Sequence, residues 1–431
     1  MKFKLTKLEK HWVLYDVGNS AFTLLVSTII PIYFDYLAGQ EKLSSVSYLA
    51  YWGYAVSIAT LLVAFMGPPL GSISDGKGLK KPIFLFSILI GALCCMALGL
   101  TSSWIFFLII SVLARIAYSA SLIFYDSMLP DVTTNERMDM VSAQGFAWGY
   151  IGSCIPFVAC LGLIMGGGKV GLSMKHSMMI SFLVVAFWWV GCSLPFLKNY
   201  RQINYVSKRK HAVTDSFASL FQTIKKIRKE KNIFWFLLAF FFYIDGVYTI
   251  IDMATAYGKA LGLNSTGLLL ALLLTQFVAF PCCIIFGRLS RKVLPDRLIA
   301  ACIFAYLGIT VFAVFMNSQL HFWILAVLVG MFQGGIQSLS RSYYAKIIPS
   351  EKSGEYFGIM DICGKGASFM GTALVSVISQ LTGSIHKGVG AIAFLFVIGL
   401  ILFFKAVSMR KEQHPEQTDR ILENEVYLTE A

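Results

Sequence analysis

Charged residues are scarce in this chain. Asp, Glu, Lys and Arg make up 14% of the 431 residues, whereas hydrophobic residues make up 57%. Ordinary soluble domains carry about 25% charged residues, so a chain this long and this apolar does not fold as one of them. The composition indicates an integral membrane protein.

The chain also lacks the cysteine and histidine spacings that are typical of disulfide frameworks and metal sites. The nine cysteines all fall inside apolar stretches, are odd in number and form no Cys-x-x-Cys motif. The six histidines are scattered, and no two of them stand at the spacing that places a pair of metal ligands on one face of a helix. We interpret the cysteines as core thiols and expect no metal and no cofactor.

The motifs of energy-coupled and catalytic proteins are absent as well. The chain contains no GxxxxGK[ST] nucleotide-binding loop, which argues against primary ATP-driven transport. No Ser-His-Asp, metal or paired-carboxylate arrangement is visible, so we expect no enzyme, and a membrane enzyme is the weakest of the alternatives. The first apolar run lacks a small-residue cleavage pattern, so we expect no removable signal peptide.

What the chain does contain is a series of long apolar runs. Each is close to the roughly 20 residues that an α-helix needs to cross a hydrocarbon core about 30 Å thick. They predict an all-α integral membrane protein with twelve transmembrane helices in two pseudo-symmetric six-helix bundles. The expected helices lie near 12–37, 47–70, 82–101, 104–126, 141–165, 177–197, 232–257, 265–286, 298–316, 320–342, 356–383 and 388–408.

A basic segment separates the two sets of six runs. From Lys198 to Lys231 it holds ten Lys and Arg against two acidic residues. Lys and Arg accumulate in cytoplasmic loops, and alternating the twelve helices puts 29 of the 36 on the side of this segment and 5 on the other. Both termini are then cytoplasmic. We expect an N-terminal bundle over 1–197, a cytoplasmic linker over 198–231, a C-terminal bundle over 232–408 and a cytoplasmic tail over 409–431.

The loop after the second run carries a pattern of glycine, aspartate and lysine. It reads Gly71-x-x-x-Asp75-x-x-Gly78-x-Lys80-Lys81. Glycine permits tight turns and close helix approach, and a carboxylate can accept hydrogen bonds from the N-terminus of a neighbouring helix. The pattern resembles a signature of the major facilitator superfamily, in which it acts as a conformational latch. An ordinary turn with lysines that fix the topology is the alternative.

The same features recur in the second half of the chain. Three pairs of positions are separated by 216, 219 and 217 residues, which indicates duplicated halves: Gly71 and Gly287, Leu129-Pro130 and Ile348-Pro349, and Asp35 and Asp252. The second loop departs from the latch pattern because Arg291 stands where the first copy has Asp75.

Five further stretches are spread over both halves. They are Trp12–Phe22, Leu129–Asp131, Gly145–Gly152, Tyr243–Thr249 and Gly334–Ser342. Together they resemble the vacuole-effluxer-like branch of the major facilitators, whose eukaryotic members are autophagy-related vacuolar amino-acid effluxers. The resemblance covers most of the chain and implies transport of an amino acid or a related metabolite.

Polar residues inside the apolar runs are candidate functional positions, because a charge exposed to lipid is costly. In facilitators the first, fourth, seventh and tenth helices line the central cavity. The resemblance therefore assigns substrate binding to Asn19, Arg115, Asp245, Gln333 and Gln337. Asp245 and Asp16 are the candidates for proton coupling, since a carboxylate that alternates between water and protein can take up and release protons. A cap or gate role is the alternative for Asp16.

Arg115 is the most informative of these residues. It stands near the middle of its run, and a guanidinium there needs a carboxylate partner or an anionic ligand. A zwitterionic solute could use Arg115 for its carboxylate and Asp245 for its ammonium group. The alternative is a permanent ion pair between the two residues that holds the halves together.

These observations favour a secondary active transporter that moves a small polar solute, an amino acid or related metabolite, by alternating access with proton coupling. A transporter of siderophores or other carboxylate metabolites and a non-transporting membrane sensor are the alternatives. We expect a monomer in the bacterial inner membrane, with protons, the solute and the lipid bilayer as partners. The net charge of +13 follows from the cytoplasmic loops, so we expect no nucleic-acid partner.

Overall fold

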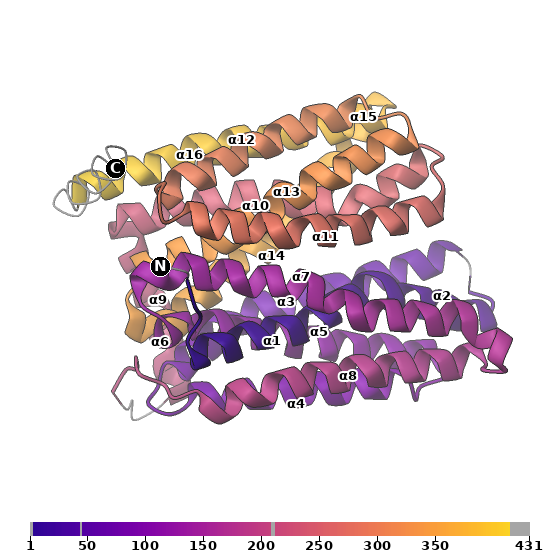
Figure 1. Cartoon of the computed structure of the whole chain (residues 1–431), viewed down its shortest axis with the longest axis horizontal. Coiled ribbons are helices and arrows are strands. Elements are labelled where there is room, and N and C mark those ends of the chain that lie inside the picture. Colours follow the sequence, from indigo (N-terminus) through magenta and orange to yellow (C-terminus); the bar gives the residue numbers. More distant parts are fainter. Residues whose placement is uncertain (1–2, 44, 208–211, 414–431) are drawn as a thin grey trace. The chain divides into compact units, whose positions relative to one another are not determined.

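The computed structural model describes residues 3–43, 45–207 and 212–413. Parts of the predicted linker (208–211) and tail (414–431) lie outside the described residues. Within the described ranges, eleven helices are long and apolar enough to cross a membrane. A further helix, α14 (Ser353–Thr382), is 30 residues long and ends in the apolar stretch Met370–Thr382. All twelve expected transmembrane helices are therefore present as helices (Figure 1).

The chain divides into two compact units. Unit 1 comprises 1–133, 148–213 and 350–358, and unit 2 comprises 134–147, 214–349 and 359–431. The helices α7 (Asn135–Gly166) and α14 each begin in one unit and end in the other. The regions expected at 1–197, 198–231, 232–408 and 409–431 stay predictions.

Unit 1 contains the first four transmembrane helices and the sixth. In it α1 packs on α8, α3 on α5, and α4 on both α5 and α8. Its helices are α1 (Lys7–Leu24), α2 (Ile30–Gln40), α3 (Ser45–Ser74), α4 (Lys80–Leu98), α5 (Trp104–Ser127), α6 (Leu129–Val132) and α8 (Met174–Asn199).

Unit 2 repeats this arrangement. Here α10 packs on α16, α11 on α13, and α12 on both α13 and α16, so each of the four helix pairs just named has its counterpart. Its helices are α9 (Ala212–Lys229), α10 (Lys231–Ala260), α11 (Ser265–Leu289), α12 (Pro295–Val314), α13 (Gln319–Ile347), α15 (Ile385–Gly390) and α16 (Ile392–Gln413). The equal spacing of motifs in the sequence thus corresponds to equal packing within each half.

Several helices extend beyond the apolar run that predicted them. The apolar run of α7 was expected from about residue 141, but the helix begins at Asn135, and Glu136 lies in its first turn. Polar residues end a hydrophobic pattern without ending a helix, because the backbone hydrogen bonds continue outside the hydrocarbon layer. These polar extensions position the candidate site described below.

The first transmembrane helix is irregular in its middle. A π-helical segment, Leu25–Ile29, separates α1 from α2, and Pro31 is the second residue of α2. Proline has no N–H and its ring crowds the carbonyl four residues earlier, so the hydrogen-bond ladder widens at this point.

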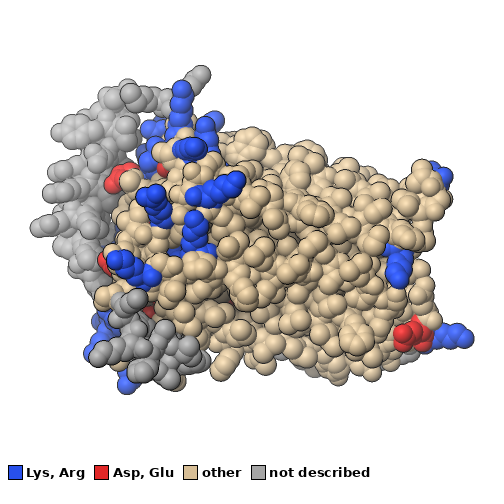
Figure 2. Space-filling view, turned by 90° about the horizontal axis from the view of Figure 1, so that it is seen from below, with Lys and Arg blue, Asp and Glu red and all other residues tan. Residues whose placement is uncertain are grey.

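Charged side chains are unevenly placed on the surface. On the face shown in Figure 2, the described Lys and Arg gather mainly at one end, and a few lie at the other end. The broad surface between the two ends shows almost no charged side chains. Large hydrophobic side chains such as Leu61, Phe65 and Phe106 are well exposed. An exposed apolar surface of this kind is stable in lipid rather than in water.

Candidate functional site

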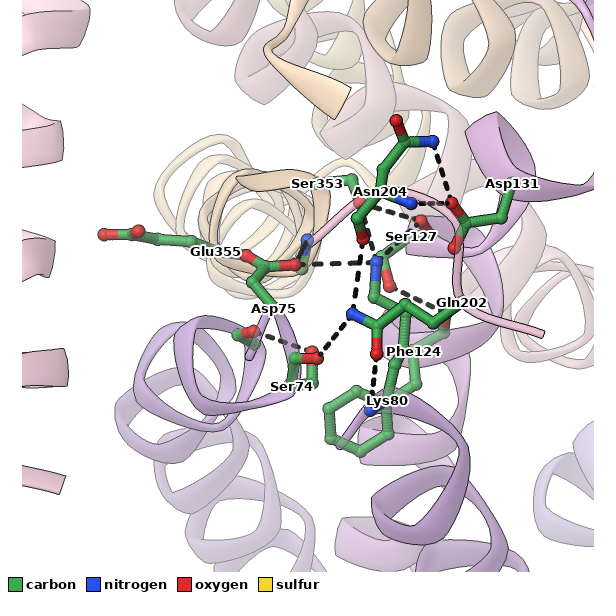
Figure 3. A network of polar contacts seen from close by, with 12 residues as sticks. Ser74, Asp75, Lys80, Phe124, Ser127, Asp131, Gln202, Asn204, Ser353 and Glu355 are labelled. Atoms are coloured by element: carbon green, nitrogen blue, oxygen red, sulfur yellow. Dashed lines mark hydrogen bonds and ion pairs between the residues drawn. The ribbon is translucent and has the colours of Figure 1, made fainter. Parts of the chain in front are cut away.

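Asp75 lies at the centre of a buried polar network in unit 1 (Figure 3). It directly follows α3 and is 1% exposed. Its Oδ1 accepts a hydrogen bond from the backbone N–H of Gly354 at 2.8 Å, and its Oδ2 accepts one from the N–H of Glu355 at 2.9 Å. Both donors belong to the first turn of α14, whose N–H groups have no partner within the helix. Asp75 therefore caps a helix that lies 280 residues further along the chain.

Lys80 joins the same network as a fully buried cation. Its Nζ lies 3.5 Å from Asp75 Oδ1 and donates to the hydroxyl of Ser353 at 2.8 Å and to the carbonyl of Ser127 at 3.3 Å. The hydroxyl of Ser353 also donates to Ser127 at 2.9 Å. A buried charge is tolerated only when it is paired and hydrogen-bonded, so the ion pair and these hydrogen bonds depend on one another.

Glycines bring the backbones of α3 and α14 into contact. A Cβ on Gly71 would overlap the carbonyl oxygen of Gly354, and a Cβ on Gly354 would overlap that of Gly71. One turn further along, a Cβ on Gly358 would lie 2.7 Å from the Cα of Pro68. Only glycine allows this approach, which sets the short distance over which Asp75 reaches the N-terminus of α14.

The start of the linker is fastened to the same loop. Gln202 Oε1 accepts from the N–H of Gly78 at 2.9 Å, and its Nε2 donates to the carbonyl of Ser74 at 3.3 Å. Gly78 has φ +75°, a conformation that favours glycine, and this turns its N–H toward Gln202. The N–H of Val206 donates to the Asp75 carbonyl at 2.8 Å. The loop that carries Asp75 is therefore held from two sides, by α14 and by the linker.

Asp131 anchors this part of the linker. Its Oδ1 accepts from the backbone N–H of Asn204 and from Asn204 Nδ2, both at 2.8 Å. Its Oδ2 accepts from the hydroxyl of Tyr200. Lys81, the last residue of the predicted latch, is half-buried.

The ionisation of Asp75 depends on its burial. Removal from water raises the pKa of its carboxyl to about 6, although Lys80 and the two N–H donors act in the opposite direction. The carboxyl is mostly ionised at pH 7 and takes up a proton more readily than an exposed Asp. If the contact with α14 opens, the carboxyl becomes solvated and its pKa returns toward 3.8, so the closed contact binds the proton more tightly.

We therefore expect the contact between Asp75 and α14 to strengthen as the pH falls from 7 to 5, and to weaken as the pH rises through about 6. Hydrogen–deuterium exchange of the Gly354 and Glu355 amides measures the strength of this contact directly. The readout is the protection factor of each amide, corrected for the pH dependence of chemical exchange. Asp75→Asn has no proton to titrate and should show no such change. A wild-type protection factor that is flat over this range, or an equal response in the variant, contradicts the assignment.

Unit 2 contains a second polar junction, built from different residues. Asp139 at the start of α7 accepts from Lys346 Nζ and from the hydroxyl of Ser342, both at 2.6 Å. Arg341 Nε donates to the hydroxyl of Ser142 at 2.9 Å. The repeated glycine keeps its packing role, because a Cβ on Gly287 would lie 2.6 Å from that of Ala143. Acidic anchoring thus comes from α7 in this half, where the loop itself carries Arg291 in place of an aspartate.

The remaining predicted residues of unit 1 lie inside its helices. Asp16 is 5% exposed and accepts hydrogen bonds from the Tyr125 hydroxyl at 2.9 Å and from Asn19 Nδ2 at 3.3 Å. Arg115 is half-buried, with its guanidinium carbon 5.6 Å from the ring centroid of Trp52. This cation–π contact stabilises the charge of Arg115.

Asp245 of unit 2 is fully buried in α10. Its Oδ1 accepts from the backbone N–H of Gly371 on α14 at 3.0 Å and from the hydroxyl of Thr249 at 3.3 Å. Its Oδ2 has no hydrogen-bond partner among the described residues. Gln333 is buried on α13, and Gln337, one turn later, is half-buried. Among the described residues, the buried carboxylate of Asp245 thus has hydrogen-bond partners on one of its two oxygens only.

Sequence reasoning missed the residues that complete the Asp75 network. Asp131 belongs to a recognised stretch, yet nothing in the sequence gave it a role, and Gln202 and Asn204 read as solvated linker residues. Ser353 and the N-terminus of α14 are more than 270 residues away from the loop. Only the fold brings these groups together.

Comparison with known proteins agrees with this architecture. The human organic anion transporter MFSD10 (TETRAN) superposes with a TM-score of 0.67 at 14% identity, over 92% of this chain and 99% of that one. FucP, a major facilitator superfamily transporter crystallised in the outward conformation, superposes with a TM-score of 0.67 at 15% identity. The match covers 93% of this chain and 97% of FucP. The fold is that of the major facilitator superfamily, and the protein is a multi-pass integral membrane protein.

Sequence similarity narrows the assignment. The model of the family described as "Vacuole effluxer Atg22 like" matches residues 6–416, and the chain belongs to this family. The uncharacterized MFS-type transporter YxiO of Bacillus subtilis (strain 168) is 42% identical, over 93% of this chain and 95% of its own length. Autophagy-related protein 22 of Coccidioides immitis (strain RS) is 23% identical, over 80% of this chain and 70% of its own length. The protein is accordingly an MFS-type transporter.

Proposed function

We propose that this transporter moves a small amino acid or related zwitterionic metabolite by alternating access, and that the transport is coupled to protons. The observation that carries the proposal is Asp245, a carboxylate buried in α10 with one oxygen lacking a hydrogen-bond partner among the described residues. An ionised carboxylate left in this state is costly, whereas a proton or the ammonium group of a solute satisfies it. Asp16, whose two oxygens both accept hydrogen bonds, is the second candidate for the proton.

Arg115 supplies the complementary charge in the proposal. A guanidinium stays charged throughout a transport cycle, and its planar fork matches a carboxylate with two parallel hydrogen bonds. Asn19, Gln333 and Gln337 offer further polar groups on α1 and α13. A carboxylate metabolite such as a siderophore would use Arg115 in the same way but would not need Asp245.

The Asp75 network fits the role of a latch. We propose that it stabilises the state in which the cytoplasmic side is closed and that it must open in each cycle. The proposed topology places the termini and the linker in the cytoplasm of a bacterial cell and the protein in its inner membrane. The supporting observation is the excess of Lys and Arg on the linker side, 29 against 5.

Substitution of Arg115 tests the contact with the solute. Arg115→Lys keeps the charge but loses the bidentate geometry, so the binding free energy of the solute should become about 1–3 kcal/mol less favourable. Amidated or decarboxylated analogues should bind the wild type weakly and lose little more in the variant. Titration calorimetry on purified protein measures both effects.

The ion-pair alternative predicts another pattern. Arg115→Ala would lower the thermal stability, and adding Asp245→Ala would largely restore it because the orphaned charge is removed. Rescue of stability in the double variant, together with unchanged analogue selectivity in Arg115→Lys, would exclude a substrate role for Arg115.

Counterflow in proteoliposomes tests the function itself. Vesicles loaded with an unlabelled amino acid should take up the same amino acid in labelled form through the wild-type protein. A membrane sensor would bind the labelled solute without this exchange, so binding without counterflow would support the sensor and contradict transport.

A further inference from the structure

The helix α9 of the linker was not expected from the sequence, and its described side chains show an unusual surface. Phe221 is 69% exposed and Ile224 is 43% exposed, while Thr223 and Ile227, on the opposite side of the helix, are buried. With 100° per residue, Phe221 and Ile224 share one face with Lys225, Arg228 and Lys229, all three of which are exposed. An aromatic and an aliphatic side chain thus stand among three cations.

These three cations have no acidic partner among the described residues. The neighbouring Lys226 forms an ion pair with Glu230 at 3.3 Å and lies beside this face on the helical wheel. Among the described residues, neither the apolar side chains nor the positive charge of this face is therefore compensated.

The connection to α10 fixes the depth of α9 relative to the membrane. A single residue, Glu230, separates the end of α9 from Lys231, the first residue of a membrane-spanning helix. Its backbone angles, φ −82° and ψ 82°, are not helical, so the chain changes direction there. One turn into α10, Trp235 packs under the Lys405 ammonium at 3.7 Å from its ring centroid. Tryptophan and lysine near the ends of spans, as Trp235 and Lys405 are, mark the interface between lipid and water.

We propose that α9 is an interfacial helix whose exposed face binds anionic phospholipids of the adjacent leaflet. Phe221 and Ile224 enter the boundary between headgroups and acyl chains, and Lys225, Arg228 and Lys229 contact the phosphates. A basic amphipathic helix at the depth of the headgroups matches this surface in both charge and polarity. The lipid contact fixes the linker beside α10.

Hydrogen–deuterium exchange of the full-length protein in nanodiscs tests the proposal. In a mixture of phosphatidylcholine and phosphatidylglycerol, the exchange rate of the amides of 221–229 should be lower than in phosphatidylcholine alone by a factor of about ten or more. The reason is that each cation near an anionic surface adds to the binding. The triple variant Lys225→Gln, Arg228→Gln, Lys229→Gln should lose this difference. Phe221→Ser should raise exchange in both lipids, since it weakens insertion rather than charge attraction.

A matched control removes three exposed lysines from the other end of the helices, Lys169→Gln, Lys259→Gln and Lys387→Gln, and should keep the effect of phosphatidylglycerol on α9. Equal wild-type exchange in the two lipid mixtures overturns the proposal, as does a triple variant that responds like the wild type. If the helix α9 unfolds in the triple variant even in phosphatidylcholine, a second measurement decides. Native mass spectrometry then compares how much phosphatidylglycerol the wild type and the single variant Lys225→Gln retain. Reduced retention in the variant supports the proposal, and equal retention overturns it.

Discussion

Replacing Gly71 with alanine should open the contact between α3 and α14 and slow transport by about tenfold or more. The added Cβ overlaps the carbonyl oxygen of Gly354 and lies 2.6 Å from its carbonyl carbon, so the two backbones must separate. Overpacking of this kind costs about 1–3 kcal/mol. The separation also lengthens the hydrogen bonds from the Gly354 and Glu355 amides to Asp75. Their exchange protection and the transport rate should therefore fall together.

Gly53→Ala is the matched control on the same helix, because a Cβ at Gly53 meets nothing within 4 Å. It should leave both readouts unchanged. If Gly71→Ala does not fold, Ser353→Ala provides a milder test, since it removes the hydroxyl that joins Lys80 to Ser127. Normal transport in folded variants that have lost the protection of Gly354 and Glu355 would show that the network is not a latch.

Replacing Asp245 with asparagine should abolish uptake driven by a pH gradient while solute exchange continues. Asparagine keeps the shape and the carbonyl oxygen that accepts from Gly371 and Thr249, but it carries no titrating proton. Net transport requires the site to return without solute after it releases a proton, whereas exchange does not require that step. The variant should therefore retain counterflow and lose accumulation.

Asp252→Asn is the control for loss of one negative charge, because Asp252 is an exposed carboxylate on the same helix. It should accumulate solute like the wild type. Gradient-driven uptake at the wild-type level in Asp245→Asn would place the proton elsewhere, and Asp16→Asn would be the next variant to measure.

The fold could be predicted from the sequence because apolar runs of membrane-spanning length appear wherever a helix crosses the bilayer. The position of the loop that carries Asp75 was predictable for a similar reason, since Gly71, Asp75 and Gly78 form a local pattern with fixed spacing. Buried charges such as Asp245 also stand out, because an ionisable residue within an apolar run is rare.

The partners of these residues were not predictable in the same way. Gln202 binds backbone groups of a loop more than 120 residues earlier in the chain, and Asp139 binds Ser342 about 200 residues later. Such contacts depend on how the helices pack rather than on any local pattern. The helix α9 escaped prediction because its many charges read as a solvated linker, although its apolar residues follow a helical period.

Accumulation of solute against its gradient tests secondary active transport most directly. Proteoliposomes containing the wild-type protein are given a pH gradient, and the internal and external concentrations of a labelled amino acid are compared with and without a protonophore. The proposed function predicts an internal concentration above the external one, lost when the protonophore is added or when Asp245 is replaced by asparagine. Binding of the amino acid without accumulation under any imposed gradient would contradict it.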